Sequence, residues 1–241
     1  MVVPTLNEAS SLGPSLDRLA VDGFDELVVA DGGSTDGARE IVQVRPGVRW
    51  IEAPRGRGIQ LQAGVRACRA ELVLLLHADT EPPLGAAAAV RAALADPGVS
   101  GGAFRARFDR RSLVLDLFSW VSRFESGWTT FGDQGLFFRR ADFERVGGLP
   151  PWPFLEDVEL RRRLKRLGAF VKRPEVVTTS ARRYLAEGPI RRQLLNVAVL
   201  LMYRAGVSPH RLARWYRART RVAPAEATAV ARASRPSVPL G

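Results

Sequence analysis

The sequence contains one cysteine, two histidines and no long hydrophobic run. A single cysteine excludes an internal disulfide, and Cys68 lies in a helical pattern, so we expect it to be a small buried apolar side chain. The most apolar late stretch, residues 194–202, is too short for a transmembrane helix, which needs about 20 residues. No signal peptide is expected at Met1. The first strand, at Val2–Val3, is so short that a few residues are expected to be missing before it. These absences predict a cytoplasmic protein.

The remaining composition is that of a globular domain with a strong positive charge. The chain has 241 residues, of which 46% are hydrophobic and 25% charged, and its net charge is +11. This charge favours an anionic partner, which could be a nucleic acid, a membrane surface or a phosphorylated substrate. Trp215-Tyr216 is the one aromatic pair set among arginines. Because a single-strand nucleic-acid groove interleaves aromatic and basic residues, we expect no nucleic-acid partner.

Short apolar runs alternate with helical patterns in the first half of the chain, which predicts βαβ units and the α/β class with a mostly parallel sheet. Strands are predicted at 27–30, 48–53 and 72–76, and helices at 7–20, 35–44, 58–70 and 84–95.

The pattern changes after residue 101. Strands are predicted at 103–108 (exposed), 135–138 and 170–178, and helices at 113–124, 142–146, 156–167, 190–203 and 209–219. From residue 222 the periodicity is lost, which predicts a disordered tail over 222–241.

Four predicted strands end in polar clusters, at residues 4–8, 31–36, 55–58 and 77–79. The carboxyl ends of parallel strands share one edge of the sheet, so these clusters are expected to line one crevice. A carboxylate on a strand tip, such as Asp79, suits a divalent cation that also holds phosphate oxygens. The alternatives remain open: Asp79 caps a following helix, and residues 31–36 form a tight turn that caps the next helix.

The motifs resemble those of family 2 glycosyltransferases. Residues 4–8 (PTLNE), 31–36 (DGGSTD) and 77–80 (HADT) look like its nucleotide-sugar motifs, 131–135 like its acceptor-side loop and 155–160 like the start of its catalytic helix. The match runs from residue 2 to about residue 184. The GDQG and TSARR segments are similar to a small bacterial subgroup of unknown substrate. The resemblance implies a GT-A fold, with a Rossmann-like, mostly parallel central sheet flanked by helices and a C-terminal helical extension.

The resemblance also implies a UDP- or GDP-sugar donor and a divalent ion, Mg²⁺ or Mn²⁺. Asp79 would stand for the last acid of the metal-binding DxD motif, while His77 stands where the first acid is usual. Asp31 would hold the base or ribose. The other residues expected to bind the donor nucleotide are Pro4, Thr5, Asn7, Glu8, Gly33, Ser34 and Arg57. Arg55 and Arg57 resemble a diphosphate clamp, with a solvated loop as the alternative.

Displacement of a nucleoside diphosphate needs a base for the acceptor hydroxyl and an electrophile for the departing phosphates. Asp157 is the expected base, with Glu156 as its orienting neighbour, and a single displacement would invert the anomeric carbon. Asp133 and Gln134 are expected to contact acceptor or sugar hydroxyls. Arg182 and Arg183 are expected to neutralise the leaving diphosphate. Each pair also has a structural alternative. Glu156 and Asp157 could be first-turn acids that stabilise the helix dipole, residues 133–134 could be a loop turn, and residues 182–183 could be a basic surface turn.

We expect a glycosyltransferase domain over 1–184, with a nucleotide-sugar half (1–100) and an acceptor and catalytic half (101–184), and a helical extension over 185–221. The extension is expected to dock on the domain. Its arginines also suit anionic headgroups at the inner face of the plasma membrane and a lipid-linked acceptor. A homodimer is a further alternative, as is a nucleotidyltransferase. The latter usually has a glycine-rich basic loop after the first strand, which residues 4–8 lack. Nucleic-acid binding is suggested only by the charge.

Overall fold

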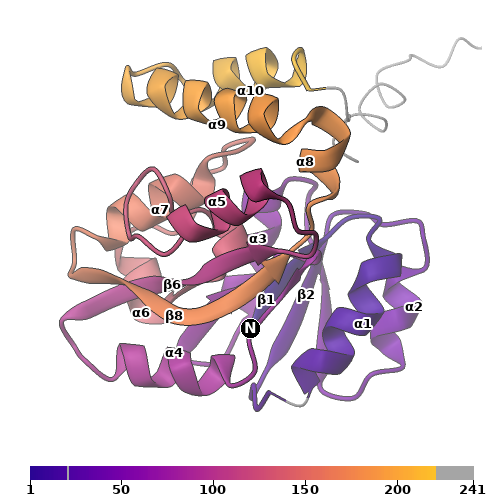
Figure 1. Cartoon of the computed structure of the whole chain (residues 1–241). Coiled ribbons are helices and arrows are strands. Elements are labelled where there is room, and N and C mark those ends of the chain that lie inside the picture. Colours follow the sequence, from indigo (N-terminus) through magenta and orange to yellow (C-terminus); the bar gives the residue numbers. More distant parts are fainter. Residues whose placement is uncertain (21, 221–241) are drawn as a thin grey trace, which may run out of the picture.

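A computed structural model describes residues 1–20 and 22–220. They form one eight-stranded sheet with helices on both faces (Figure 1), and the strand order is β3-β2-β1-β4-β7-β6-β8-β5. The strands are β1 (Val2–Thr5), β2 (Leu27–Asp31), β3 (Val48–Glu52), β4 (Leu72–Leu75), β5 (Thr80–Glu81), β6 (Val99–Phe108), β7 (Leu136–Arg139) and β8 (Ala169–Thr179). The GT-A-type α/β fold predicted from the sequence is confirmed, and its sheet is mixed in the second half.

The first four strands in the sheet order are parallel, and three of them, β2, β1 and β4, are largely buried on both faces, whereas the edge strand β3 is partly exposed. Alternate residues of each strand point to opposite sides, so Val2 and Val3 belong to different core clusters. The clusters are closed on one face by α1 (Ala9–Ala20), α2 (Ala38–Gln43) and α4 (Ala86–Leu94), and on the other by α3 (Arg57–Ala67), α6 (Arg140–Arg145) and α7 (Glu156–Leu164). This parallel half brings the polar strand ends to one edge.

The second half of the sheet contains the one strand whose environment was predicted wrongly. β6 lies between the antiparallel strand β7 and the parallel strand β8, and residues 99–104 are buried rather than exposed. The alternation of apolar residues and arginine occupies only the end of β6, around Arg105 and Arg107. Pairing on both edges buries the rest, which includes the glycine pair Gly101-Gly102.

Two elements were not predicted. The two-residue strand β5 pairs antiparallel with β8, and the hydroxyl of Thr80 donates to the hydroxyl of Thr179 at 3.1 Å in a buried site. Asp79 therefore precedes a strand, and α4 begins only at Ala86. The second element is the helix α8 (Arg182–Glu187), which follows β8 directly and runs across residue 184, the expected domain boundary.

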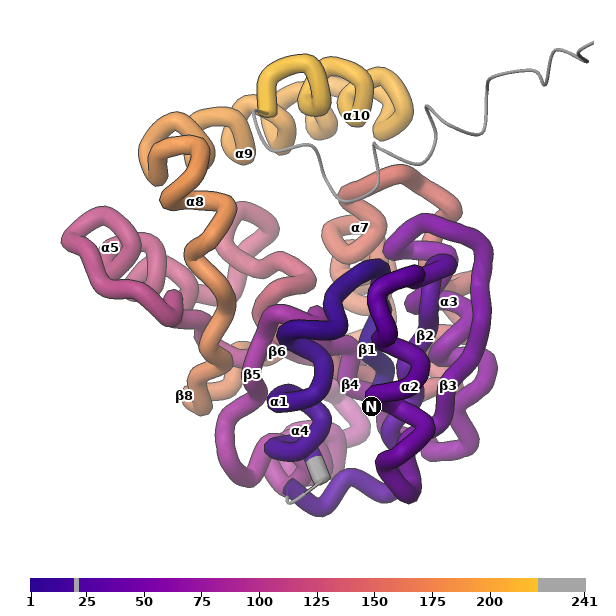
Figure 2. The backbone as a smooth tube through the Cα atoms, turned by 90° about the vertical axis from the view of Figure 1, so that its right-hand side faces the viewer, coloured from indigo at the N-terminus to yellow at the C-terminus, as the bar shows by residue number. Residues whose placement is uncertain are grey.

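The C-terminal helices form a layer above the strand ends (Figure 2). They are α9 (Pro189–Arg204) and α10 (Pro209–Arg217), and α5 (Leu113–Val121) lies beside α9. Val199, Leu200 and Leu212 pack on Leu155 and Val158 at the start of α7. Among residues 1–20 and 22–220, no helix is long and apolar enough to cross a membrane. The tail predicted over 222–241 lies outside the described residues.

Candidate active site

The loops after β1 and β2 are bonded to each other at the sheet edge. The backbone N–H of Asn7 donates to Oγ of Ser34 at 2.9 Å, and Oδ1 of Asn7 accepts from the N–H of Thr35 at 2.9 Å. Asn7 has a φ of 54°, in the left-handed region that asparagine tolerates better than most residues. Oδ2 of Asp36 accepts from the N–H of Ala9 at 2.7 Å, at the start of α1. The two predicted donor loops therefore form a single unit.

Asp31 is the centre of the second loop. Its Oδ2 accepts from the N–H groups of Gly33 at 2.8 Å and Ser34 at 2.9 Å, and its Oδ1 accepts from the Ser34 hydroxyl. Asp31 is only 4% exposed. The tight turn that was the alternative prediction for residues 31–36 is thus present. A ligand that bonds to this carboxylate would replace one of these hydrogen bonds.

Gln60 holds the ends of β1 and β2 together, and sequence reasoning missed it. Its Nε2 donates to the carbonyl oxygens of Thr5 at 2.6 Å and Ala30 at 2.9 Å. The side chain is buried directly under Gly32, where a Cβ would lie 2.9 Å from Cδ of Gln60. In the sequence Gln60 is one polar residue in a helix with little amphipathic pattern, so nothing distinguishes it.

Arg57, the first residue of α3, connects three parts of the site. Its Nε bonds to Oε1 of Glu156, its Nη2 lies 3.5 Å from Oδ1 of Asp157, and its Nη1 lies 3.3 Å from Nε2 of His77. The predicted diphosphate clamp thus has its guanidinium engaged with two acids and a histidine. This ion pair balances the buried charge of Glu156, which is fully buried.

Glu156 and Asp157 open α7 on a constrained backbone. The preceding residue, Leu155, has a φ of 66°, which costs energy for a side chain with a Cβ and is kept here by burial of Leu155. Oδ2 of Asp157 accepts from the N–H of Gly132 at 2.5 Å, and Oδ1 accepts from the N–H of Val158 at 2.9 Å. These two hydrogen bonds fix the predicted base, Asp157, in one orientation. Burial raises the pKa of its neighbour Glu156.

The predicted acceptor loop, the 3-10 helix η1 (Gly132–Gln134), packs directly on Asp157. Oδ1 of Asp133 is buried and has no hydrogen-bond partner among the described residues. Burial and the neighbouring charge of Asp157 raise the pKa of Asp133 to about 6, with a smaller contribution from Asp79. Asp133 thus lies within electrostatic range of Asp157 and Asp79, and we call these three residues the acidic cluster, although their side chains do not converge on one point.

Gln134 points away from this cluster. It is 4% exposed, its Nε2 donates to the carbonyl of Thr129 at 2.6 Å, and its Oε1 bonds to Nζ of Lys172. Burial lowers the pKa of Lys172 to about 7. The loop-turn alternative describes Gln134 best. Lys172 is a second residue that sequence reasoning missed, since a lysine in a strand carries no distinctive signal.

His77 and Asp79 follow β4 at the same edge. Burial, with the charges of Arg57 and Arg183, holds the pKa of His77 well below its usual value, so the ring is neutral and its Nε2 can accept from Arg57. Asp79 is half-buried. Within residues 1–20 and 22–220, no group of three or more His, Cys, Asp or Glu side chains converges on a point where a metal could bind.

Arg182 and Arg183 begin α8 at the rim of the site. Nη2 of Arg182 lies 3.6 Å from Oε1 of Glu8, so the first loop and α8 meet here. Arg182 remains largely exposed, and Arg183 is near enough to His77 to lower its pKa. The structure thus brings the predicted residues of both halves together around one edge, with Arg182 and Arg183 exposed at its rim.

Comparison with known families identifies the first part of the chain. The model of "Glycosyl transferase family 2" matches residues 1–140. The glycosyltransferase AglJ of Haloferax volcanii is 31% identical over 80 residues, and the dolichyl-phosphate beta-glucosyltransferase ALG5C of Trichomonas vaginalis is 34% identical over 94 residues. These matches cover 33% and 32% of this chain, but only 26% and 28% of the two relatives. The match therefore spans little more than a quarter of either relative.

Solved structures share the fold over most of the chain. The mannosyltransferase PcManGT of Pyrobaculum calidifontis, in complex with GDP-Man and Mn²⁺, has a TM-score of 0.64 and 25% identity; the match covers 85% of this chain and 62% of that one. The glucosyl-3-phosphoglycerate synthase of Mycobacterium tuberculosis, in complex with Mn²⁺, UDP and its product, has a TM-score of 0.57 and 21% identity, with coverages of 86% and 79%.

Proposed function

The chain belongs to glycosyl transferase family 2, and on this premise we propose that it moves a sugar from a nucleoside-diphosphate sugar to an acceptor hydroxyl with inversion at the anomeric carbon. The observation that carries the proposal is the carboxylate of Asp157. It is held by the N–H of Gly132 at 2.5 Å and stands beside Arg57 at the edge where the parallel strands end. A hexose is the expected sugar, since the names of one relative and two solved neighbours carry glucose or mannose.

Asp157 is the proposed general base. It would take the proton of the acceptor hydroxyl while the oxygen attacks the anomeric carbon and the bond to the diphosphate breaks. Arg57 pairs with both Glu156 and Asp157, so Glu156 would position Arg57 beside the base rather than meet substrate. One base opposite one leaving group gives a single displacement, and therefore inversion.

The donor nucleotide is proposed to lie along the joined loops of β1 and β2. Pro4, Thr5, Asn7 and Glu8 would form one wall, and Asp31, Gly33 and Ser34 the other. GDP-Man bound to one structural neighbour and UDP bound to another support this class of ligand. Arg182 and Arg183 would stabilise the charge on the departing diphosphate from the rim.

Asp79 is the proposed protein ligand of Mg²⁺ or Mn²⁺. It is a half-buried carboxylate at the strand tip and belongs to the acidic cluster, in which one oxygen of Asp133 has no hydrogen-bond partner among the described residues. An ion held by so few protein oxygens fits this site only if donor phosphates and water complete its shell. When bound, the ion would neutralise charge on the diphosphate. Asp133 would face the sugar or the acceptor.

A thermal-shift screen of UDP- and GDP-sugars, with and without Mn²⁺, tests this function. We expect one donor to raise the melting temperature, and the same donor to release its nucleoside diphosphate when an acceptor is present. The anomeric configuration of the product, read by NMR, tests inversion. Release of pyrophosphate from a nucleoside triphosphate and a sugar phosphate, with no donor binding, would overturn the proposal in favour of a nucleotidyltransferase.

A further inference from the structure

Exposed apolar side chains are concentrated in two segments of the chain, around α5 and around α9. Of the twelve large hydrophobic residues that are exposed in the described part of the chain, nine lie between Leu113 and Trp128 or between Leu185 and Leu201. Those on α5 and just after it are Leu113, Leu117, Trp120 and Phe124, and those on α9 are Ile190, Leu194 and Leu201. We call these seven residues the apolar face.

Each half of the apolar face follows helical spacing. On α5 the four residues recur at intervals of four, three and four, and on α9 they share a stripe with Val197 between Leu194 and Leu201. The opposite sides of the same helices are buried, as Leu115 and Val199 show, with exposures of 0% and 3%. One face of each helix is therefore packed against the rest of the protein. The apolar face is a second one, and no described residue covers it.

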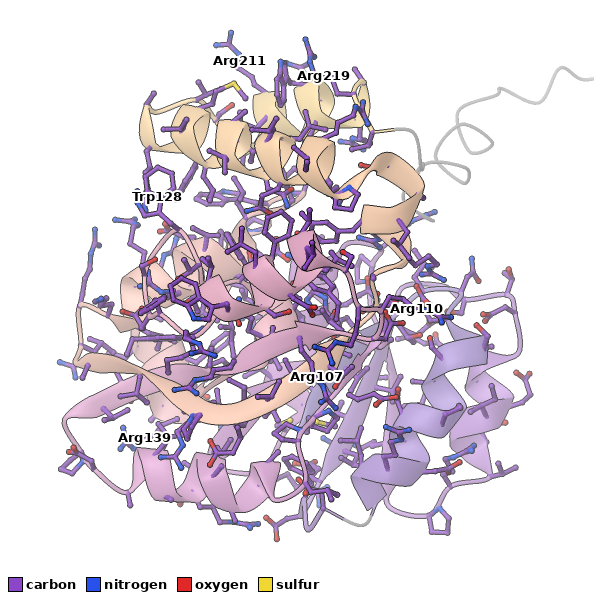
Figure 3. All side chains as sticks on the ribbon, viewed as in Figure 1. Arg107, Arg110, Trp128, Arg139, Arg211 and Arg219 are labelled. Atoms are coloured by element: carbon purple, nitrogen blue, oxygen red, sulfur yellow. The ribbon has the colours of Figure 1, made fainter. Side chains whose placement is uncertain are left out.

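The two helices that carry the stripes, α5 and α9, lie side by side (Figure 1). Tyr184 in α8 contacts both helices: its ring is 6.0 Å from the ring of Phe118 of α5, and its hydroxyl is 3.4 Å from Gln193 of α9. Near their ends, the guanidinium of Arg204 lies 3.7 Å above the ring of Trp128 (Figure 3). α5 and α9 thus run together in the same direction, and an open hollow of about 580 Å³ lies along α9 at Ile190, Leu194 and Ala198.

Many arginines lie in the same part of the chain as the apolar face, and their positive charge favours an anionic partner. Residues 182–220 contain nine arginines and one acid, Glu187. Arg211 and Arg219 point away from the body of the protein beyond α9, and Arg110 lies near the start of α5 (Figure 3). A second copy of the chain would bring arginines against arginines. An anionic lipid surface would neutralise them and accept the leucines, and tryptophan with arginine beside it, as in Trp120 and Arg123, suits the headgroup region.

We propose that the apolar face and these arginines dock on the surface of an anionic bilayer, with α5 and α9 lying in the interface. Docking there would place the rim of the site close to the lipid, because α8 carries both Arg183, near His77, and Tyr184, against α5. An acceptor carried by a lipid would then reach the site from the membrane. The inference goes beyond the proposed function, and vesicle binding requires neither donor nor transfer.

Flotation of the full chain with vesicles tests the docking. We expect it to float with vesicles of phosphatidylcholine and phosphatidylglycerol, and to remain free with phosphatidylcholine alone. The double variant Leu117→Glu/Leu194→Glu should bind the anionic vesicles at least about tenfold more weakly. Leu84→Glu is the matched control, because Leu84 is 87% exposed and precedes α4, outside the apolar face. It should bind as the parent does.

Two results would overturn the proposal. Anionic vesicles that bind the double variant as tightly as the parent would show that the arginines act alone. The second result is that the parent does not float, forms a dimer without lipid, and becomes a monomer in the double variant. The apolar face would then bind a second copy of the chain. Equal melting temperatures of the double variant and Leu84→Glu would show that either result comes from a folded protein.

Discussion

The backbone N–H of Gly132 donates to Oδ2 of Asp157 at 2.5 Å, although the two residues are 25 positions apart in the chain. A Cβ on Gly132 would lie 2.8 Å from that oxygen and 3.2 Å from Nε2 of His77. Only glycine therefore lets the loop approach the carboxylate this closely. The orientation of the proposed base is set by the acceptor-side loop as well as by its own helix, so the two halves of the site are coupled here.

Gly132→Ala should therefore impair transfer more than folding. The new methyl group must displace Asp157 or the loop, and a misplacement of about 1 Å can cost about 100-fold in rate. We expect kcat to fall by that order, measured by release of nucleoside diphosphate. Gly13→Ala in α1 is the control, since the atoms nearest its Cβ are side-chain atoms at 3.4 Å or more. It should keep full activity, and an equal loss in both variants would contradict the coupling.

Asp157→Asn should remove the base and leave the donor site intact. The amide keeps the size of the side chain but cannot take a proton, so kcat should fall about 10²- to 10⁴-fold while the Kd of the donor stays the same. Single-turnover rates and donor titration measure the two quantities. The control is Asp25→Asn, because Asp25 is an exposed acid that pairs with Arg91. Normal turnover by Asp157→Asn would remove Asp157 from the mechanism.

The sequence predicted the parallel half of the fold because β1, β2 and β4 are largely buried on both faces and therefore appear as short apolar runs, whereas the edge strand β3 mixes polar and apolar residues. β6 escaped this rule, since Gly101 and Gly102 interrupt its apolar run and Arg105 and Arg107 mark only its end. β5, with two residues, is too short to show any period. Strands of this kind form because they pair with other strands. When the paired strand lies in another part of the chain, the local sequence does not predict the pairing.

The candidate site was predictable where a residue follows a strand end and obscure where it acts through another residue. Asp31 and Asp79 stand at strand tips, so the topology alone brings them to one edge. Gln60 and Lys172 act on neighbouring loops from inside a helix and a strand. Arg57 was predicted to meet phosphate because it follows glycine. Its pairing with Glu156 spans 99 residues and depends on the tertiary fold.

Arg57→Gln should destabilise the protein by about 3–5 kcal/mol, the usual cost of leaving a buried charge without its partner. Glu156 is then unpaired and fully buried. The double variant Arg57→Gln/Glu156→Gln should recover much of this loss, because it leaves no unpaired charge at position 156. Denaturant unfolding measures the free energies, and additive losses in the double variant would show that the two residues do not act as a pair.

Removal of the ion should weaken donor binding without unfolding the chain. Asp79 offers a single half-buried carboxylate, so phosphate oxygens must hold much of the ion. We expect EDTA to abolish most of the melting-temperature gain that the donor gives with Mn²⁺, and to leave the donor-free protein unchanged. Asp79→Asn should reproduce the loss in the presence of Mn²⁺. A donor gain that survives EDTA in full would show that Arg182 and Arg183 suffice.

The stability conferred by Asp133 should fall as the pH rises. Burial and the charge of Asp157 raise the pKa of Asp133 from its ordinary value of 3.8 to about 6. Between these values the folded state keeps a proton that the unfolded chain releases, so the unfolded state gains with pH. Asp133→Asn does not titrate. Its melting temperature should therefore rise relative to the parent's from pH 4 to pH 6, and the difference should stay constant above pH 6.

Asp25 is the control for this measurement, because its pKa is shifted in the opposite direction to that of Asp133. The hydrogen bond from Arg91 holds the pKa of Asp25 below its ordinary value, so this carboxylate stabilises the folded state above about pH 4 and loses that effect as the pH falls. The melting temperature of Asp25→Asn should thus drop relative to the parent's as the pH rises toward 4, and stay level from pH 4 to pH 6, where that of Asp133→Asn climbs. Parallel trends in the two variants would mean that Asp133 is ionised in the folded protein at low pH. The acids at the sheet edge would then be separated by solvent rather than crowded around Asp157.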